Sequence, residues 1–231
     1  MKIAGLQKLT LLDFPGETAC IVFTPGCNFN CPYCHNSHII HHNHEEMSLE
    51  EFFKFLESRK GLLDGVVVSG GEPTLQKDLA RFLYEIKRMG FKVKLDTNGT
   101  RPAVLEDLIA QDLVDYIAMD VKNCPSEYIK TSGTVDMTIF DIQDSIKLLK
   151  KWNGQYEFRT TVVRELHSAN TLSNMAKWLK RMFGKFEVPK LYLQKFVKSD
   201  TVVYELTPPS DSEMELYKTI VSKYVPNVEI R

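Results

Sequence analysis

The chain has no apolar run long enough to span a membrane. A membrane-spanning helix needs about 18 or more consecutive apolar residues, and no stretch of this 231-residue sequence approaches that length. The first residues, Met1 to Gly5, lead into mixed polar sequence without the apolar core of a signal peptide. We therefore expect a cytoplasmic protein with no membrane partner.

An excess of one charge is also missing. The sequence has 29 Lys and Arg against 30 Asp and Glu, and these residues are spread along the chain with no dense basic block. Proteins that bind nucleic acid neutralise its phosphates with clustered basic residues. Nucleic acid is therefore not expected as a partner.

Cysteine is scarce and unevenly placed. There are five cysteines, an odd number, and three of them fall within eight residues, which suits a reducing compartment better than a disulfide framework. Cys20 lies in a strand-like run and is predicted to be a small buried hydrophobe. Cys124 precedes Pro125 and reads as the start of a loop.

The order of strand-like and helical runs predicts an α/β fold. No repeat or low-complexity tract interrupts the chain, and its one short connector is Pro208-Pro209. Alternating strands and amphipathic helices imply parallel strands joined by helical crossovers. The predicted strands cover residues 19–24, 65–69, 91–96, 116–121, 157–163 and 190–196.

Six such units predict an incomplete (β/α)6 barrel, open at one side, in a single domain over residues 1–231. Its parts are an N-terminal segment over 1–18, a cysteine-containing loop over 25–47 and a C-terminal helix over 210–224. Two helix starts carry capping boxes, Ser48 with Glu51 and Ser210 with Glu213. Because sites in barrels gather at the carboxyl ends of the strands, the open side would admit a large substrate there.

The run Cys27-Asn-Phe-Asn-Cys31-Pro-Tyr-Cys34 carries the strongest chemical signal. Ferredoxins close all the irons of a cluster with cysteine, whereas this run supplies three thiolates and so suits a cluster with one open iron. A zinc site is the main rival, with His35 or the later histidines 38, 41, 42 and 44 as a fourth ligand. Read simply, the histidine-rich stretch is a solvated connector.

A second motif, Ser69-Gly70-Gly71-Glu72-Pro73, closes the second predicted strand. Two glycines let the backbone approach a ligand closely, and Glu72 supplies a carboxylate for an ammonium group. On its own such a turn is often an ordinary loop. With the cysteines at the same end of the barrel, it indicates a ligand site.

Together these motifs resemble the radical S-adenosylmethionine superfamily. Asp96-Thr97-Asn98-Gly99 and Asp120-Val121-Lys122 extend the resemblance to the activating enzymes of glycyl-radical proteins. The segment Leu9 to Gly16 is most similar to anaerobic ribonucleoside-triphosphate reductase activating proteins. The chain lacks the cysteines and length of an inserted ferredoxin-like domain, so it resembles the small, single-cluster type.

The resemblance implies a 4Fe-4S cluster held by Cys27, Cys31 and Cys34, with S-adenosylmethionine chelating the open iron. Reductive cleavage would give a 5'-deoxyadenosyl radical that takes hydrogen from the substrate; this is cofactor chemistry, so no general acid or base is assigned. The implied cofactor-binding residues are Tyr33, His35, Asn36, Gly70, Gly71, Glu72, Asp96, Thr97, Asn98, Lys122, Arg159 and Gln194.

Within that set, the resemblance places Tyr33 near the adenine, the Gly70 to Glu72 turn near the methionine ammonium and Lys122 near the methionine carboxylate. Asp96, Thr97 and Asp120 would hold a monovalent cation, a role suited to oxygen ligands. Arg159 reads equally well as a structural ion pair, since arginine is seldom buried unpaired.

The implied function is an activase that installs a glycyl radical on anaerobic ribonucleoside-triphosphate reductase, with a flavodoxin or ferredoxin-type protein as electron donor. Three alternatives stay open at this point. These are an activase of another glycyl-radical enzyme such as pyruvate formate-lyase, a small-molecule enzyme like the deazaguanine synthases, and a zinc-binding module without turnover.

Overall fold

The computed structural model describes residues 1–40 and 46–231. The predicted histidine connector lies partly outside this range, because His41, His42 and His44 are not among the described residues. The strands are β1 (Gly5–Thr10), β2 (Ala19–Thr24), β3 (Gly65–Gly70), β4 (Lys92–Thr97), β5 (Tyr116–Asp120), β6 (Gln155–Val162), β7 (Leu191–Lys195) and β8 (Val228–Ile230).

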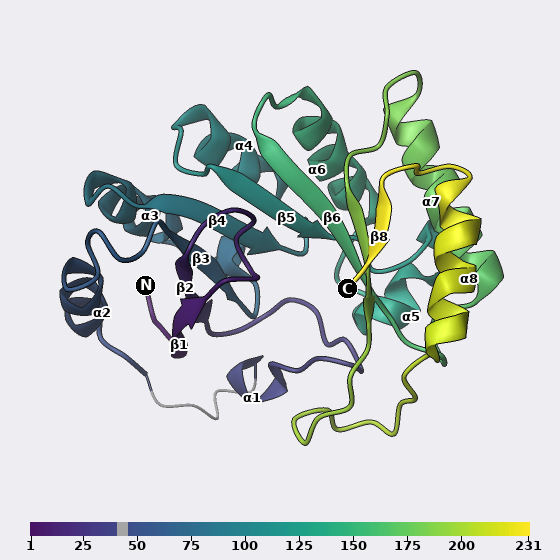
Figure 1. Cartoon of the computed structure of the whole chain (residues 1–231), viewed down its shortest axis with the longest axis horizontal. Helices are drawn as coiled ribbons and strands as arrows, with labels where there is room; N and C mark the ends of the chain where they lie inside the picture. The colour runs from purple at the N-terminus through teal and green to yellow at the C-terminus, as the bar shows by residue number, and fades with distance from the viewer. Residues whose placement is uncertain (41–45) are drawn as a thin grey trace. The chain divides into compact units, whose positions relative to one another are not determined.

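Helices occupy most of the connections between strands (Figure 1). The helices are α1 (Ser37–Ile40), α2 (Leu49–Glu57), α3 (Leu79–Arg88), α4 (Pro102–Ala110), α5 (Tyr128–Ser132), α6 (Ile139–Lys151), α7 (Ala169–Phe183) and α8 (Asp211–Ser222), with short 3-10 turns η1 (Pro73–Leu75) and η2 (Pro125–Glu127). In the described ranges, no helix combines the length and apolar character needed to cross a bilayer.

The strands form one eight-stranded sheet in the order β1 to β8. β1 runs antiparallel to β2, whereas β2–β3, β3–β4, β6–β7 and β7–β8 pair in parallel. The predicted α/β class with a largely parallel sheet is therefore confirmed. Parallel strands are covered on both faces, which is why β2 and β3 read as nearly continuous apolar runs.

All six predicted strands are present, and the sheet has two more. The six predicted strands correspond to β2 through β7, and each boundary agrees within two residues. The two additional strands lie at the edges of the sheet. β1 is half exposed and mixed in polarity, and β8 has three residues, so neither carries the alternating or continuous apolar pattern that identifies a strand.

The chain divides into two compact units. The first unit comprises residues 1–28, 36–97 and 103–118, and the second comprises residues 29–35, 98–102 and 119–231. The single-domain expectation stays a prediction.

The first unit has a core of aromatic and aliphatic side chains. These are Phe14, Ala19, Ile21, Val67, Tyr116 and Ala118. Helices α2 and α3 pack through rings: the Phe52 centroid lies 5.3 Å from that of Phe53 and 5.3 Å from that of Phe82. The predicted capping box of Ser48 and Glu51 is present at the start of α2, so local sequence fixes where this helix begins.

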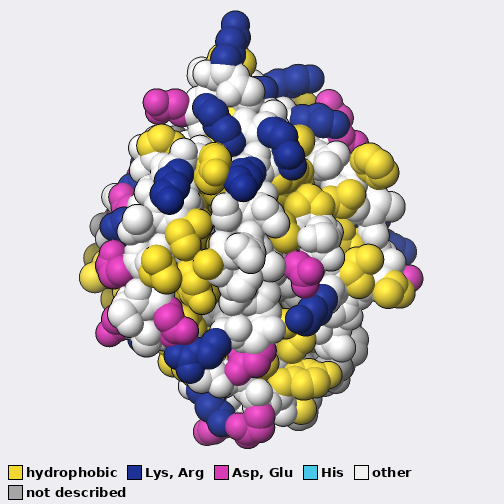
Figure 2. All heavy atoms as spheres, turned by 90° about the vertical axis from the view of Figure 1, so that its right-hand side faces the viewer, with side chains coloured by type: hydrophobic (Ala, Val, Ile, Leu, Met, Phe, Trp, Pro, Cys, Tyr) yellow, Lys and Arg dark blue, Asp and Glu magenta, His cyan; other side chains and the backbone are white. Residues whose placement is uncertain are grey.

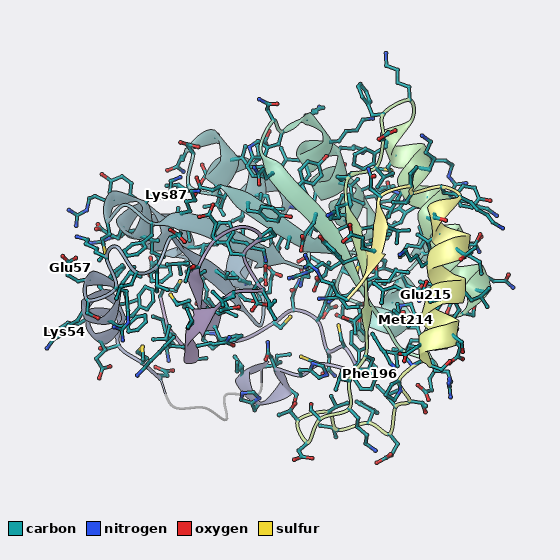
Figure 3. The ribbon with its side chains drawn as sticks, in the orientation of Figure 1. Lys54, Glu57, Lys87, Phe196, Met214 and Glu215 are labelled. Atoms are coloured by element: carbon teal, nitrogen blue, oxygen red, sulfur yellow. The ribbon has the colours of Figure 1, made fainter. Side chains whose placement is uncertain are left out.

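In the second unit, α7 and α8 lie side by side (Figure 1). Met214 on α8 is buried, whereas the adjacent Glu215 points outward (Figure 3). The capping box predicted at Ser210 and Glu213 is also confirmed. Figure 2 views the side of the molecule that carries α7 and α8, and Lys and Arg side chains gather at one end of it. The last turn of α7 contains two basic residues. Basic side chains at that position interact favourably with the negative end of the helix dipole.

Candidate active site

In the first unit, the turn after β3 fits only glycine at two positions. Gly70 has a φ of +123°, and a Cβ there would lie 2.2 Å from the Thr24 nitrogen. At Gly71 a Cβ would lie 1.8 Å from the carbonyl oxygen of Gly26. These contacts are far below van der Waals distance, so the two glycines allow the turn to lie directly against the backbone that leads into Cys27.

Backbone hydrogen bonds hold the turn in that place. The Gly71 N–H donates to the Thr24 carbonyl at 2.9 Å, and the Glu72 N–H donates to the Gly26 carbonyl at 2.8 Å. Asn36 adds a side-chain bond from Nδ2 to the Gly70 carbonyl at 3.1 Å. The structure therefore brings Asn36 and the Gly-Gly-Glu motif together, and their role in binding a cofactor stays a prediction.

Glu72 is buried, with 1% of its surface exposed. Its Oε1 accepts hydrogen bonds from the Thr74 N–H at 3.1 Å, from the Thr74 hydroxyl, and from the Thr97 hydroxyl at 2.8 Å. Buried carboxylates need such donors, because an unpaired charge in the interior is costly. The carboxylate is thus held in one orientation by the ends of β3 and β4.

Asp96 pairs with a lysine that was not predicted as a site residue. Lys94 is only 1% exposed, forms an ion pair with Asp96, and places its Nζ 5.9 Å from the centroid of the Tyr116 ring. Both residues lie on one face of β4, since they are two positions apart. That spacing is the sequence signal that could have found Lys94.

In the second unit, Asp120 holds two cations at the end of β5. Lys122 Nζ lies 2.9 Å from Asp120 Oδ2, and Arg159 Nε lies 3.0 Å from Asp120 Oδ1. Burial by itself would raise the pKa of Asp120, but the Lys122 and Arg159 charges outweigh it and bring the pKa to about 2. Burial likewise opposes the charge on Lys122, and the Asp120 carboxylate keeps its pKa well above the usual range.

Tyr33 lies beside this charged group. Its ring packs with Val163, Leu166 and Phe196, and the Lys122 Nζ is 5.9 Å from the ring centroid. Its hydroxyl is buried, and its nearest polar group for a hydrogen bond is the Cys31 thiol. The ring therefore lies between the cysteine motif and Lys122.

The cysteine motif is tied to the same unit by two of its three cysteines. The Cys34 N–H donates to the Cys31 carbonyl at 3.1 Å and closes a turn. Burial raises the pKa of the Cys31 thiol, although the nearby Lys122 ammonium acts in the opposite direction. Cys27 belongs to the first unit.

The remaining predicted residues have local contacts. The His35 ring stacks on Phe196, labelled in Figure 3, with centroids 5.7 Å apart, and His35 Nε2 lies 2.7 Å from the Val197 carbonyl. Asn98 Oδ1 accepts from the N–H of Thr100 at 3.0 Å and from its hydroxyl at 2.7 Å. Gln194 lies on β7 opposite Thr161 of β6, and the structure does not join it to the Lys122 group.

Two residues of the second unit were missed by sequence reasoning. Both are buried: Asn123 directly follows Lys122 and donates to the Leu166 carbonyl, and His167 bonds to the Lys122 carbonyl. Each is a single polar residue in a loop, a pattern that is usually an ordinary surface feature. No spacing or motif in the sequence distinguishes them.

The donor chemistry fits an iron-sulfur cluster. All five cysteines are thiols, and Cys27, Cys31 and Cys34 are partly exposed, whereas Cys20 and Cys124 are buried. The buried-hydrophobe prediction for Cys20 is confirmed, and burial raises the pKa of its thiol to about 12. Three accessible thiols within eight residues are suitable soft ligands. Among residues 1–40 and 46–231, however, no three His, Cys, Asp or Glu side chains are gathered closely enough to hold a metal ion.

A hollow in the first unit contains none of the predicted site residues. It has a volume of about 620 Å³ and lies at α2 and α3, where its walls include Phe53, Arg81 and Phe82. Pockets of this size often take ligands. The predicted site residues of this unit lie instead at or beyond the carboxyl ends of β2, β3 and β4.

Residues 21–167 match the radical SAM superfamily. The chain therefore belongs to the radical SAM superfamily, whose cofactors are a 4Fe-4S cluster and S-adenosylmethionine. Solved structures support the fold. The chain aligns with Streptococcus suis SuiB bound to S-adenosylmethionine at a TM-score of 0.66 and 12% identity, over 91% of this chain and 51% of that one. A domain of pyruvate-formate lyase-activating enzyme from Bacteroides vulgatus aligns at 0.58 and 17%, over 72% and 98%. The radical SAM partial-barrel fold is thereby confirmed.

Proteins with similar sequences indicate which group within the superfamily the chain belongs to. A Methanocaldococcus jannaschii protein named as a candidate glycyl-radical enzyme activating enzyme is 35% identical over 99% of this chain and 95% of its own length. The pyruvate formate-lyase-activating enzyme of Staphylococcus aureus is 30% identical over 75% and 77%. Within the superfamily, the chain belongs with the glycyl-radical enzyme activating enzymes.

Proposed function

We propose that this protein generates a glycyl radical on a protein substrate, and that the substrate is anaerobic ribonucleoside-triphosphate reductase. The activase assignment rests chiefly on the 35% identity, over nearly the whole of both chains, to a protein named for that activity. The choice of reductase rests on the segment Leu9 to Gly16, which is similar to activating proteins of that enzyme.

In this proposal Cys27, Cys31 and Cys34 bind the cluster through their thiolates. When bound, the cluster and S-adenosylmethionine supply one-electron chemistry that ends in hydrogen abstraction from the substrate. The protein itself binds and orients these cofactors and the substrate. Glu72 receives the methionine ammonium, and Lys122 receives the methionine carboxylate, since each pairing joins opposite charges through hydrogen bonds.

Further residues of the proposed site are assigned with them. Tyr33 lies beside the adenine. Asp96, Thr97 and Asp120 supply oxygen ligands for a monovalent cation. Asp96 already pairs with Lys94, and Asp120 already pairs with Lys122 and Arg159. A bound cation would therefore compete with these basic side chains for the two carboxylates.

Electron paramagnetic resonance on mixed proteins tests the function. Anaerobic protein with S-adenosylmethionine, reduced flavodoxin and the cognate reductase should give a glycyl doublet. The Cys31→Ala variant should lose both the cluster and S-adenosylmethionine cleavage, whereas Cys20→Ala should mainly affect packing. Cleavage retained by Cys31→Ala would contradict the ligand assignment, and no doublet with the reductase would contradict the substrate.

Pyruvate formate-lyase is the second candidate substrate. The relation to the Staphylococcus aureus activating enzyme favours it, although that alignment covers a smaller share of the chain. The same spectroscopic assay with purified pyruvate formate-lyase in place of the reductase separates the two. Substituting a ferredoxin for flavodoxin in either mixture identifies the electron donor.

A further inference from the structure

The segment that carries Lys122 has no regular secondary structure. Lys122 follows β5 and precedes the 3-10 turn η2, so its position depends on bonds from neighbouring elements. The Val121 N–H donates to the Arg159 carbonyl at 2.8 Å, and the Thr160 hydroxyl donates to the Val121 carbonyl at 2.7 Å. Strand β6 therefore fixes the residue before Lys122.

The carbonyl of Lys122 itself is bound by a histidine. His167 Nε2 lies 2.9 Å from the Lys122 oxygen. The side chain is 3% exposed and lies in the turn between β6 and α7, directly before the N-cap Ser168. Because the ring is buried, this bond is a direct link from the turn between β6 and α7 to the Lys122 backbone.

The contact of Nε2 fixes where His167 carries a proton. A carbonyl oxygen only accepts, so Nε2 must bear the proton that it donates to the Lys122 carbonyl. On the other side of the ring, the Val163 N–H donates to Nδ1 at 3.1 Å, while the Val163 carbonyl lies 3.3 Å from Nδ1 and accepts the backbone N–H of His167 at 2.8 Å.

A neutral ring agrees with its surroundings. Burial lowers the pKa of His167, while its bonds to Lys122 and Val163 act in the opposite direction and the Lys130 ammonium on α5 lowers the pKa further. A neutral ring with its proton on Nε2 satisfies both the Lys122 carbonyl and the Val163 N–H.

Asn123 ties the following residue to the same turn. Its Nδ2 donates to the Leu166 carbonyl at 2.9 Å and to the Thr131 hydroxyl at 3.0 Å, and its Oδ1 accepts the Cys124 N–H at 2.8 Å. The peptide group of Lys122 is thus held on both sides. A lysine side chain is flexible and loses rotamer entropy when it binds, so a fixed backbone reduces what remains to be ordered.

We propose that His167 is a positioning residue that fixes Lys122 for the carboxylate of S-adenosylmethionine. This rests on the proposed function for the ligand, while the link between the two side chains rests on the geometry alone. Without the imidazole, the Lys122 carbonyl loses the hydrogen-bond donor that holds it. The Lys122 backbone is then less fixed, and its ammonium group no longer occupies a single position. His167 acts through Lys122 and touches no reacting atom.

Ligand affinities of the reconstituted, anaerobic protein test the proposal. The probes are S-adenosylhomocysteine, which carries the amino-acid carboxylate, and methylthioadenosine, which lacks it. His167→Leu should weaken S-adenosylhomocysteine binding about tenfold, the effect of losing part of a hydrogen bond to a charged group, and leave methylthioadenosine binding unchanged. His167→Gln keeps an N–H donor and should recover most of the affinity.

Leu179→Ala is the control for general destabilisation, because it removes a fully buried apolar side chain of α7. Equal weakening of both ligands by His167→Leu, as for Leu179→Ala, would overturn the positioning role. So would unchanged affinity for both.

Nitrogen-15 NMR separates this proposal from the proposed function. The wild-type imidazole should show its proton on Nε2, and the Lys122 Nζ signal should move in His167→Leu but not in Leu179→Ala. If the wild type binds neither adenosyl ligand, the proposed function fails, and an Nζ signal that still moves keeps the positioning role. A proton on Nδ1 or an unmoved Nζ signal overturns it.

Discussion

Two loops at the carboxyl ends of parallel strands are built in different ways. The turn after β3, in the first unit, is held by backbone hydrogen bonds and by two glycines that leave no room for a Cβ. The segment after β5, in the second unit, is held largely by side-chain hydrogen bonds that join it to β6 and to the turn after β6. The first kind of loop carries its own motif, whereas the second depends on residues some 40 positions away in the sequence.

The largest expected effect comes from adding a side chain to the turn after β3, where there is no room for a Cβ. Gly71→Ala would place a Cβ 1.8 Å from the Gly26 carbonyl oxygen, so the free energy of unfolding should fall by about 3 kcal/mol. Urea unfolding measures this. Gly61→Ala is the control: its φ is +76° with nothing within 4 Å of a Cβ, and it should cost about 1 kcal/mol. Equal losses for the two variants would show that close packing does not define this turn.

Removing charge from the same loop should affect binding more than folding. Glu72→Gln keeps an oxygen for Thr74 and Thr97 but cannot pair with an ammonium. We expect S-adenosylmethionine affinity to fall by about 10- to 100-fold, the range for a hydrogen bond to a charged group, measured by calorimetry on the reconstituted protein. Glu57→Gln, on the outer part of α2 (Figure 3), should leave affinity unchanged. A Glu72→Gln protein with wild-type affinity would remove Glu72 from the site.

The second loop should weaken when its side-chain support is removed. Asn123→Ala leaves the Leu166 carbonyl and the Cys124 N–H without their buried partner, so unfolding should become easier by about 2 kcal/mol. Thermal unfolding measures the loss against Asn153→Ala, which changes an exposed residue. A loss no greater than that of Asn153→Ala would mean that backbone contacts hold this loop as well.

The smallest expected effect is a dependence on pH that the first loop does not share. Because the folded pKa of His167 is lowered, the unfolded state binds a proton first as pH falls below about 6.5. The stabilisation is therefore present above that pH and declines below it. Between about pH 7.5 and 5.5 the wild type should lose about 1 kcal/mol more than His167→Gln. Parallel pH profiles in urea unfolding would show that the ring is not held neutral.

The sequence predicted the first loop well because its constraints are local. A Gly-Gly pair after an apolar run, and three thiols at short spacing, are written in consecutive residues. The same locality explains the confirmed helix starts at Ser48 and Ser210, where each cap and its partner are three residues apart. Such features need no knowledge of the fold.

The second loop could be predicted only in part. Asp120 and Lys122 were found by resemblance, but their supports were not, because burial converts an ordinary loop polar residue such as His167 or Asn123 into a structural link only after β5 and β6 are adjacent. Lys94 differs, because its partner Asp96 is two residues away and the spacing was a local signal; it was missed because a lysine in a strand is normally exposed.

The burial of two cysteines allows the remaining thiols to be counted by chemical labelling. Cys20 and Cys124 are 0% and 2% exposed, so an alkylating reagent applied to folded, metal-free protein should reach Cys27, Cys31 and Cys34 and leave the other two until the chain unfolds. The number of labels per chain then falls by one for every thiolate that a cluster occupies. Mass spectrometry of the labelled protein therefore reads cluster occupancy directly from the chain, without measuring iron.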